Sequence, residues 1–315
     1  MTRTSKNQAH NVLPGTVIRG KWHHCRYRIV RPLGRGANGD VFLAESPSGR
    51  VAVKVGHESM SITSEVNVLK QFSRVQGNVL GPSLIDVDDW VTHDGTHPFY
   101  VMEYLRGEPL LSYVHAKGEE WIGILMVQLL ADLDRLHREG WVFGDLKPDN
   151  LIVVGPPPRI RWLDVGGTTM IGRSVKEYTE FFDRGYWGLG SRKAEPTYDL
   201  FSVGMIMVNM AYPRRFNKKK EGIRQLREAM HGNPLLRRYR KVISAALEGK
   251  YPDAPSMRRD VVQIMSVPLG YKPGDSRVKN RKQKKPGKKS NGWLQTLLLA
   301  AFLFAAYFFY LFGVH

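Results

Sequence analysis

The chain has 315 residues, of which 42% are hydrophobic and 24% charged, an ordinary balance for a globular protein with one large domain or two lobes. Its single cysteine, Cys25, excludes an internal disulfide framework and a zinc site built on cysteine ligands. The net charge of +18 indicates an anionic partner, either a nucleic acid or a lipid surface.

The first half of the chain is predicted to be rich in β-strands. Residues 1–20 are polar without a clear period, so we expect a flexible arm there. Three short runs of β-branched residues bounded by turns then predict antiparallel strands at residues 27–30, 41–44 and 51–55. Apolar residues at helical spacing predict a helix at 60–72, and a further apolar run predicts a strand at 99–104.

The second half is predicted to be mainly helical. A long amphipathic helix is expected at about 119–138, where one face carries five residues that we interpret as core, namely Ile122, Leu125, Leu129, Leu133 and Leu136. A strand ending at Asp164 and an irregular segment to about residue 195 follow. Further helices are expected at 200–210, 222–247 and 256–266. A small sheet followed by a helical half predicts an α+β fold with two lobes.

The C-terminal region divides into a basic linker and an apolar segment. Residues 271–292 carry nine Lys or Arg against one acid and are rich in Gly and Pro, so they cannot pack a core. Residues 294–314 carry no charge, and as a helix they would span about 31 Å, close to the hydrocarbon core of a bilayer at about 30 Å. We predict a transmembrane helix at 293–315, the alternative being a buried C-terminal helix. The basic flank predicts a single-pass protein of the cell membrane with its main domain in the cytoplasm.

One loop carries the residues that phosphoryl transfer requires. Asp145, Lys147 and Asn150 lie in the sequence Gly-Asp-Leu-Lys-Pro-Asp-Asn, and a second acid, Asp164, follows the next apolar run. In such a set one carboxylate orients the hydroxyl, a cation meets the γ-phosphate, and an amide and the second carboxylate hold Mg²⁺.

A glycine-rich segment in the first half supplies a second phosphate-binding element. Residues 33–41 read G-x-G-x-x-G-x-V after Leu33 and lie between two predicted strands, which argues against a dinucleotide-binding fold. Their glycines let backbone amides approach phosphates. Lys54 ends the run Val-Ala-Val-Lys and is expected to pair with the α- and β-phosphates.

In this order and at these spacings, residues 27 to about 268 resemble a eukaryotic-like (Hanks-type) serine/threonine protein kinase. With its basic linker and apolar end, the chain is similar to the single-span kinases of spore-forming Bacillus. The resemblance implies a kinase domain at 21–268, with a small N-lobe at about 21–103 and a larger helical C-lobe at about 104–268. It also implies protein substrates and the cofactors ATP and Mg²⁺, with Mn²⁺ as an alternative ion.

The resemblance also implies roles for single residues. The catalytic group would be Asp145, Lys147, Lys54 and Glu65, with Glu65 pairing with Lys54 and Glu58 as a rival for that place. The metal ligands would be Asn150 and Asp164, and Asp199 would hold the backbone of the catalytic loop. Met102 would be the gatekeeper, and residues 103–105 the hinge that holds adenine. The nucleotide would contact Leu33, Gly34, Gly36, Gly39, Val41, Ala52, Lys54, Met102, Glu103 and Leu105.

The sequence departs from the family pattern in three places. Phe143-Gly144 stands where His-Arg is usual, which removes the cation that reads a phosphorylated activation loop. Asp164-Val165-Gly166 replaces Asp-Phe-Gly, and no Ala-Pro-Glu precedes Asp199 at the usual distance. The hydroxyls between these points are candidate autophosphorylation sites or ordinary loop residues, namely Thr168, Thr169, Ser174 and Thr179.

The sequence is also compatible with functions other than a protein kinase. A pseudokinase scaffold is disfavoured because Lys54, Asp145, Asn150 and Asp164 are all present, and Lys147 disfavours a small-molecule kinase of the aminoglycoside or choline type. A DNA or membrane tether remains a further alternative. The basic patch of the linker could bind DNA phosphates without sequence readout, or anionic lipid, through Arg277, Lys279, Arg281, Lys282, Lys284, Lys285, Lys288 and Lys289. The sequence gives no prediction of oligomeric state.

Overall fold

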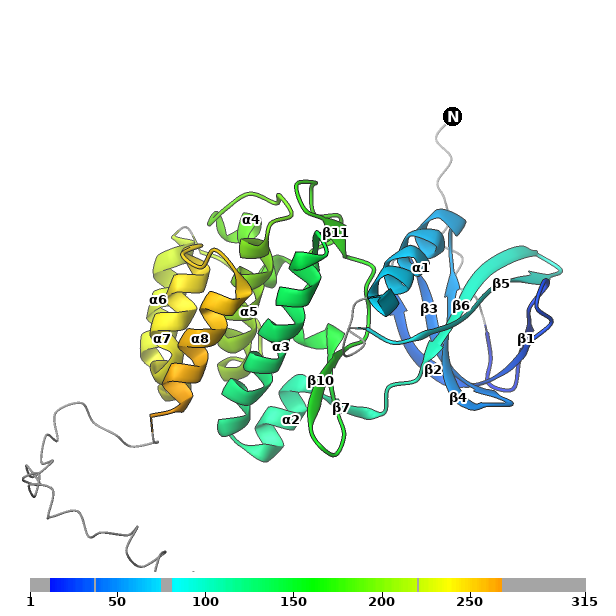
Figure 1. Ribbon diagram of the computed structural model, residues 1–315, viewed down its shortest axis with the longest axis horizontal. Helices are drawn as coiled ribbons and strands as arrows, with labels where there is room; N and C mark the ends of the chain where they lie inside the picture. Colours follow the sequence, from blue (N-terminus) through cyan, green and yellow to red (C-terminus); the bar gives the residue numbers. More distant parts are fainter. Residues whose placement is uncertain (1–11, 37, 75–80, 220, 268–315) are drawn as a thin grey trace, which may run out of the picture. The chain divides into compact units, whose positions relative to one another are not determined.

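The computed structural model describes residues 12–36, 38–74, 81–219 and 221–267 (Figure 1). Within these ranges the chain forms a β-rich N-lobe, drawn blue to cyan, followed by a helical C-lobe, drawn green to orange. The predicted α+β order with two lobes is therefore confirmed.

One antiparallel sheet of six strands forms the N-lobe, in the order β1-β2-β3-β4-β6-β5. Its strands are β1 (Val17–Arg19), β2 (Arg26–Gly36), β3 (Gly39–Ser46), β4 (Gly49–Gly56), β5 (Leu84–Thr92) and β6 (Gly95–Glu103). The glycine-rich segment joins β2 to β3, and β4 lies between β3 and β6, with Lys54 opposite Val41 and Tyr100. Helix α1 (Ser59–Arg74) packs on the sheet through Val66, Leu69 and Phe72, all nearly inaccessible to solvent.

Residues 17–23, which precede β2, pack on the N-lobe sheet. Strand β1 pairs with β2, and Ile18 is completely buried, although we predicted a flexible arm for residues 1–20. The carboxylate of Asp88 on β5 accepts the backbone N–H groups of Trp22 at 2.9 Å and His23 at 2.7 Å. These long-range contacts, which no local pattern reveals, fix the segment; residues 1–11 lie outside the described ranges.

The C-lobe is built from helices that pack in pairs. Its longer helices are α2 (Leu110–Lys117), α3 (Glu120–Arg138), α5 (Pro196–Ala211), α6 (Gly222–Gly232), α7 (Pro234–Leu247) and α8 (Ala254–Met265). Helix α5 packs on α7 and α3 packs on α8, and α3 buries the five apolar residues of its predicted stripe. The range 222–247 holds two helices, because the Asn233 side chain accepts the backbone N–H of Leu235 and Pro234 begins a new helix.

Short strands and turns carry the catalytic loop, which is residues 143–150, and the activation segment, which is residues 164–195. Strands β7 (Gly107–Pro109), β9 (Leu151–Val154) and β10 (Arg159–Trp162) form one small sheet, and β8 (Trp141–Val142) pairs with β11 (Thr169–Met170). The 3₁₀ turn η1 (Pro148–Asn150) precedes β9, while η2 (Glu180–Phe182) and α4 (Arg184–Trp187) lie in the activation segment. The hairpin of β9 and β10 brings Asn150 close to Asp164, since Leu163 N–H donates to the Asn150 carbonyl oxygen at 2.9 Å.

Among the described residues, none of the helices combines the length and the apolar character that a membrane span requires. The predicted transmembrane helix at 293–315 and the basic linker at 271–292 lie outside the described residues.

Candidate active site

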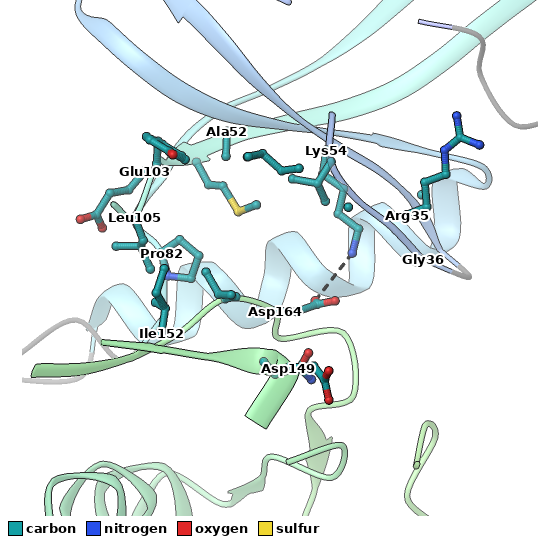
Figure 2. Close-up of a pocket in the computed structure, with 18 of the residues that line it drawn as sticks. Arg35, Gly36, Ala52, Lys54, Pro82, Glu103, Leu105, Asp149, Ile152 and Asp164 are labelled. Carbon is teal, nitrogen blue, oxygen red and sulfur yellow. Dashed lines mark ion pairs between the residues drawn. The ribbon is translucent and has the colours of Figure 1, made fainter. Parts of the chain in front are cut away.

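A cavity of about 620 Å³ lies between the N-lobe sheet and the catalytic loop (Figure 2). Its size suits a nucleotide-sized ligand. It is lined by all ten residues that were predicted to contact the nucleotide, which are Leu33, Gly34, Gly36, Gly39, Val41, Ala52, Lys54, Met102, Glu103 and Leu105. The two predicted metal ligands, Asn150 and Asp164, lie on the opposite wall of the same cavity.

Lys54 lies at the deep end of this cavity and is held by two carboxylates. Its Nζ is 2.6 Å from Glu65 Oε2. It is also 3.7 Å from Asp164 Oδ1, and the dashed line in Figure 2 marks this second ion pair. Tyr100 donates its hydroxyl to the same Glu65 oxygen at 2.8 Å. Of the two candidates for the helix acid, the structure therefore brings Glu65 rather than Glu58 to Lys54.

The charges of this pair follow from burial and proximity. Burial opposes the ammonium of Lys54, but the carboxylates of Asp164 and Glu65 outweigh burial and raise its pKa above the usual value. Lys54 is therefore a cation although it is only 4% exposed. Burial also raises the pKa of Glu65, and the facing Lys54 opposes that rise. The cavity thus holds a fixed positive charge where an anionic ligand can reach it.

Asp145 lies in a small network of side chains near the start of the catalytic loop. One of its carboxylate oxygens is paired with Lys147, and the other accepts the hydroxyl of Thr179 at 2.9 Å. Lys147 also donates to the Thr179 hydroxyl oxygen at 3.0 Å. The three side chains hold one another in a defined geometry, as a general base that must meet a substrate hydroxyl requires.

Asn150 and Asp164 offer oxygen ligands on the same wall. Asn150 donates its side-chain amide to the Asp145 carbonyl oxygen at 2.9 Å, and Asp164 Oδ1 accepts the backbone N–H of Gly166 at 2.9 Å. Within the described part of the chain, no hydrogen bond reaches Asn150 Oδ1 or Asp164 Oδ2. These two oxygens have the chemistry of ligands for a hard divalent cation.

Asp199, at the start of α5, is completely buried beneath the catalytic loop. Its carboxylate accepts the backbone N–H groups of Phe143 at 2.8 Å and Gly144 at 3.0 Å, and it contacts His137 Nε2 at 2.9 Å. A buried carboxylate is stabilised by such donors. The contact with the loop backbone is the one that we expected for this residue.

Two glycines explain the missing arginine at position 144. Gly144 has a φ of 84°, and a Cβ there would lie 2.5 Å from the Gly167 carbonyl oxygen. A Cβ on Gly167 would in turn lie 2.9 Å from that of Asp145. The backbone after Asp164 therefore packs directly on the catalytic loop, and a side chain at 144 has no room. Val165, which replaces the usual phenylalanine, is 2% exposed within the core.

Some residues of the site were missed. Thr179 is predicted as a candidate autophosphorylation site or an ordinary loop hydroxyl, not as a partner of the catalytic loop, yet it contacts both Asp145 and Lys147. The cavity floor also includes Ile152 and Leu163, which flank Asn150 and Asp164 in sequence. Their closeness in sequence to Asn150 and Asp164 predicts that they line the same cavity, whereas no local pattern predicts the contacts of Thr179.

Comparison with known proteins agrees with this geometry. The model of the protein kinase domain family matches residues 27–278, so the chain belongs to the protein kinase family. The chain is 48% identical to the serine/threonine-protein kinase YabT of Bacillus subtilis, across 96% of both chains. It is also 34% identical to the serine/threonine-protein kinase Pkn1 of Myxococcus xanthus, over 44% of this chain and 21% of that one. Human mitogen-activated protein kinase 12 is 28% identical over 65% of this chain and 58% of its own.

The chain is therefore a serine/threonine protein kinase, a phosphotransferase, as the motifs predicted. The resemblance to bacterial Hanks-type kinases is confirmed, because YabT matches nearly the whole chain. These similarities favour a protein kinase over a small-molecule kinase.

Proposed function

We propose that the chain transfers the γ-phosphate of Mg·ATP to serine or threonine hydroxyls of proteins, with Asp145, Lys147 and Lys54 as its catalytic residues. The observation that carries this proposal is the nearly buried cation Lys54, held by Glu65 at 2.6 Å and facing Asp164 at 3.7 Å across the cavity. A fixed cation opposite a carboxylate suits a triphosphate and its metal ion, because each charge of the ligand meets one of opposite sign.

The residues around the cavity fit both groups. Ala52, Met102 and Leu105 supply apolar surface for a purine base, and the backbone of 103–105 would hold its edge. Asn150 and Asp164 would hold Mg²⁺ through the oxygens that accept no hydrogen bond from the described residues. Bound ATP would supply the phosphoryl group that is transferred. Bound Mg²⁺ would compensate the negative charge of the phosphates during the transfer.

The remaining steps belong to the protein's own side chains. Asp145 would orient the substrate hydroxyl and accept its proton, because its carboxylate is held by Lys147 and Thr179. Lys147 would then be close enough to stabilise negative charge on the transferred group. Asp199 keeps the backbone of this loop in place through its contacts with Phe143 and Gly144.

A magnesium titration of Asp164→Asn tests the metal site. The amide removes one anionic ligand, so we expect the Mg²⁺ concentration for half-maximal activity to rise by about tenfold or more. Asp94→Asn, an exposed acid in the turn between β5 and β6, makes the same chemical change away from the cavity and should leave the titration unchanged. An identical magnesium dependence in both variants would contradict the proposed metal site.

We further propose that the chain is anchored in the cell membrane by residues 293–315, with its catalytic domain in the cytoplasm, and that the basic patch of the linker contacts DNA or anionic lipid. The sequence supports this proposal through 21 uncharged residues next to a dense group of cations. Contacts of such cations with DNA would be made to phosphates and would weaken steeply with salt.

Two measurements on the C-terminal region test this part. The full-length chain should sediment with membranes, and a chain ending at Asn291 should be released from them. The shortened chain should retard duplex DNA at low salt, and replacing Lys282, Lys284, Lys285 and Lys288 with Gln should abolish the retardation. A shortened chain that binds phosphatidylserine vesicles but no DNA would assign the patch to lipid.

A further inference from the structure

A basic loop follows helix α5 and has no part in the chemistry described above. We define it as residues 213–219, Pro-Arg-Arg-Phe-Asn-Lys-Lys, in which four of seven residues are cations and none is an acid. A concentration of like charge on a surface favours partners of the opposite sign.

Arg215 connects this loop to both sides of the catalytic centre. Its guanidinium forms an ion pair with Asp149 and lies 4.9 Å from the ring centre of Phe182. Asp149, four residues beyond Asp145 in the catalytic loop, lines the cavity (Figure 2). Phe182 lies three residues after Thr179, and the hydroxyl of Thr179 donates to Asp145. The basic loop therefore lies at the rim where a substrate hydroxyl must approach Asp145.

Packing against the activation segment fixes the position of the basic loop. The ring of Phe216 packs edge-on against Phe181 at 5.3 Å and Trp187 at 6.0 Å between ring centres. Lys218 Nζ donates to the carbonyl oxygen of Tyr186 at 2.9 Å. Charges held in this way need little ordering when a partner binds.

The charged side chains at this rim differ in whether a described residue already neutralises them. Arg214 and Lys219 are exposed, and neither side chain has an ion pair or hydrogen bond within the described ranges. Asp149 is the acid that could bind a basic residue of a substrate, but Arg215 already neutralises it. Glu180 is an exposed acid on the same rim and offsets part of the positive charge.

We propose that the basic loop selects protein substrates that carry Asp or Glu beside the phosphorylated serine or threonine. Arg214, whose charge no described residue neutralises, binds these carboxylates, and the ion pair between Arg215 and Asp149 prevents Asp149 from selecting basic residues. The inference rests on the proposed transfer at Asp145, and it names the class of substrate that reaches that residue.

Synthetic peptides test the proposal with the full-length kinase. Three peptides of equal length carry one serine flanked on both sides by Asp and Glu, by Ala, or by Lys. We expect the wild type to prefer the acidic over the basic peptide in kcat/KM by about tenfold, mainly through KM, with a preference that declines as salt is added. Arg215→Ala removes a cation and frees Asp149, so it should reduce this ratio by about fivefold, while the KM for ATP stays constant.

Two further variants separate substrate selection from folding. Arg214→Glu reverses an exposed charge without breaking a contact of the described residues, so it should weaken the acidic peptide with little effect on stability. Arg224→Ala, on the exposed face of α6, is the matched control and should keep the wild-type ratio.

The outcomes are distinguishable. Equal labelling of all peptides by the wild type, or a ratio unaffected by Arg215→Ala and Arg214→Glu, would overturn the inference while leaving the kinase assignment intact. Loss of duplex-DNA binding in these variants without any change in peptide preference would reassign the loop to nucleic acid and equally overturn it. A peptide labelled as well by Asp145→Asn as by the wild type would instead refute the proposed function.

Discussion

At residue 144 the backbone has a φ of 84°, and the carbonyl oxygen of Gly167 occupies the place where a Cβ would extend. The family's arginine cannot be accommodated there without moving the backbone that leads to Asp145. Asp145 is thus positioned by contacts between main chains as well as by the side chains of Lys147 and Thr179. The absence of an arginine at 144 also removes the usual reader of a phosphorylated activation loop.

Gly144→Ala tests this close contact. An alanine there suffers both the strain of positive φ and the clash with Gly167, so we expect it to lower the free energy of unfolding by about 3 kcal/mol and to reduce kcat strongly. Gly140→Ala is the matched control, because Gly140 has the same φ of 84° with no heavy atom within 4 Å of the Cβ position. That variant should cost about 1 kcal/mol and retain activity. Chemical unfolding gives the free energy of unfolding of both variants, and steady-state kinetics gives their kcat. Equal losses in the two variants would show that the clash with Gly167 is unimportant.

At the scale of elements, helix α5 and the activation segment contact the catalytic loop and fix its position. Asp199 lies in the first turn of α5 and accepts the N–H groups of Phe143 and Gly144. The aromatic rings of Phe181, Trp187 and Phe216 pack edge-on between the activation segment and the loop after α5. Helix α5 therefore holds the irregular backbone of the catalytic loop in place, and the segment after it packs on the activation segment.

The elements with a strong period could be predicted from the sequence. The stripe of α3 and the three strands around the glycine-rich segment were expected because one face of each must be buried. The break at Asn233-Pro234 was missed, although an N-cap followed by proline is a local signal. The contacts of Thr179 and Arg215 could not be predicted, because they join segments of irregular backbone far apart in the chain.

At the scale of the whole domain, the cavity depends on residues from both lobes. The residues that line the cavity could be predicted because the family motifs recur in order, whereas the side-chain contacts that join the lobes carry no motif. One such link is Glu103 at the end of β6. Its carboxylate accepts hydrogen bonds from Arg161 on β10 at 2.9 Å and from the Ser83 backbone at 3.2 Å. The side chain of a hinge residue thus connects the N-lobe sheet to the small sheet of the C-lobe.

This link predicts a dependence of stability on pH. Burial would raise the pKa of Glu103, but the bonds from Arg161 and Ser83 outweigh burial and lower the pKa below its ordinary value of 4.5. The contribution of ionised Glu103 to stability is therefore present above pH 4.5 and is lost as the pH falls through the lowered pKa. Glu103→Gln should flatten the decline in unfolding free energy between about pH 5 and pH 3.

Urea unfolding at a series of pH values measures this effect. Glu108→Gln changes an exposed carboxylate on β7 and should keep the wild-type slope. Parallel curves for the wild type and Glu103→Gln would show that the contact does not contribute.

The central claim is that Asp145 performs phosphoryl transfer, and it is tested most directly by labelling a protein substrate with γ-labelled ATP and Mg²⁺. We predict that the wild type labels serine and threonine and that Asp145→Asn loses activity by about a hundredfold or more, because the general base is gone. Asp134→Asn makes the same change in an acid of α3 that pairs with Arg138, and it should label as the wild type does. Equal labelling by the wild type and Asp145→Asn would contradict the account.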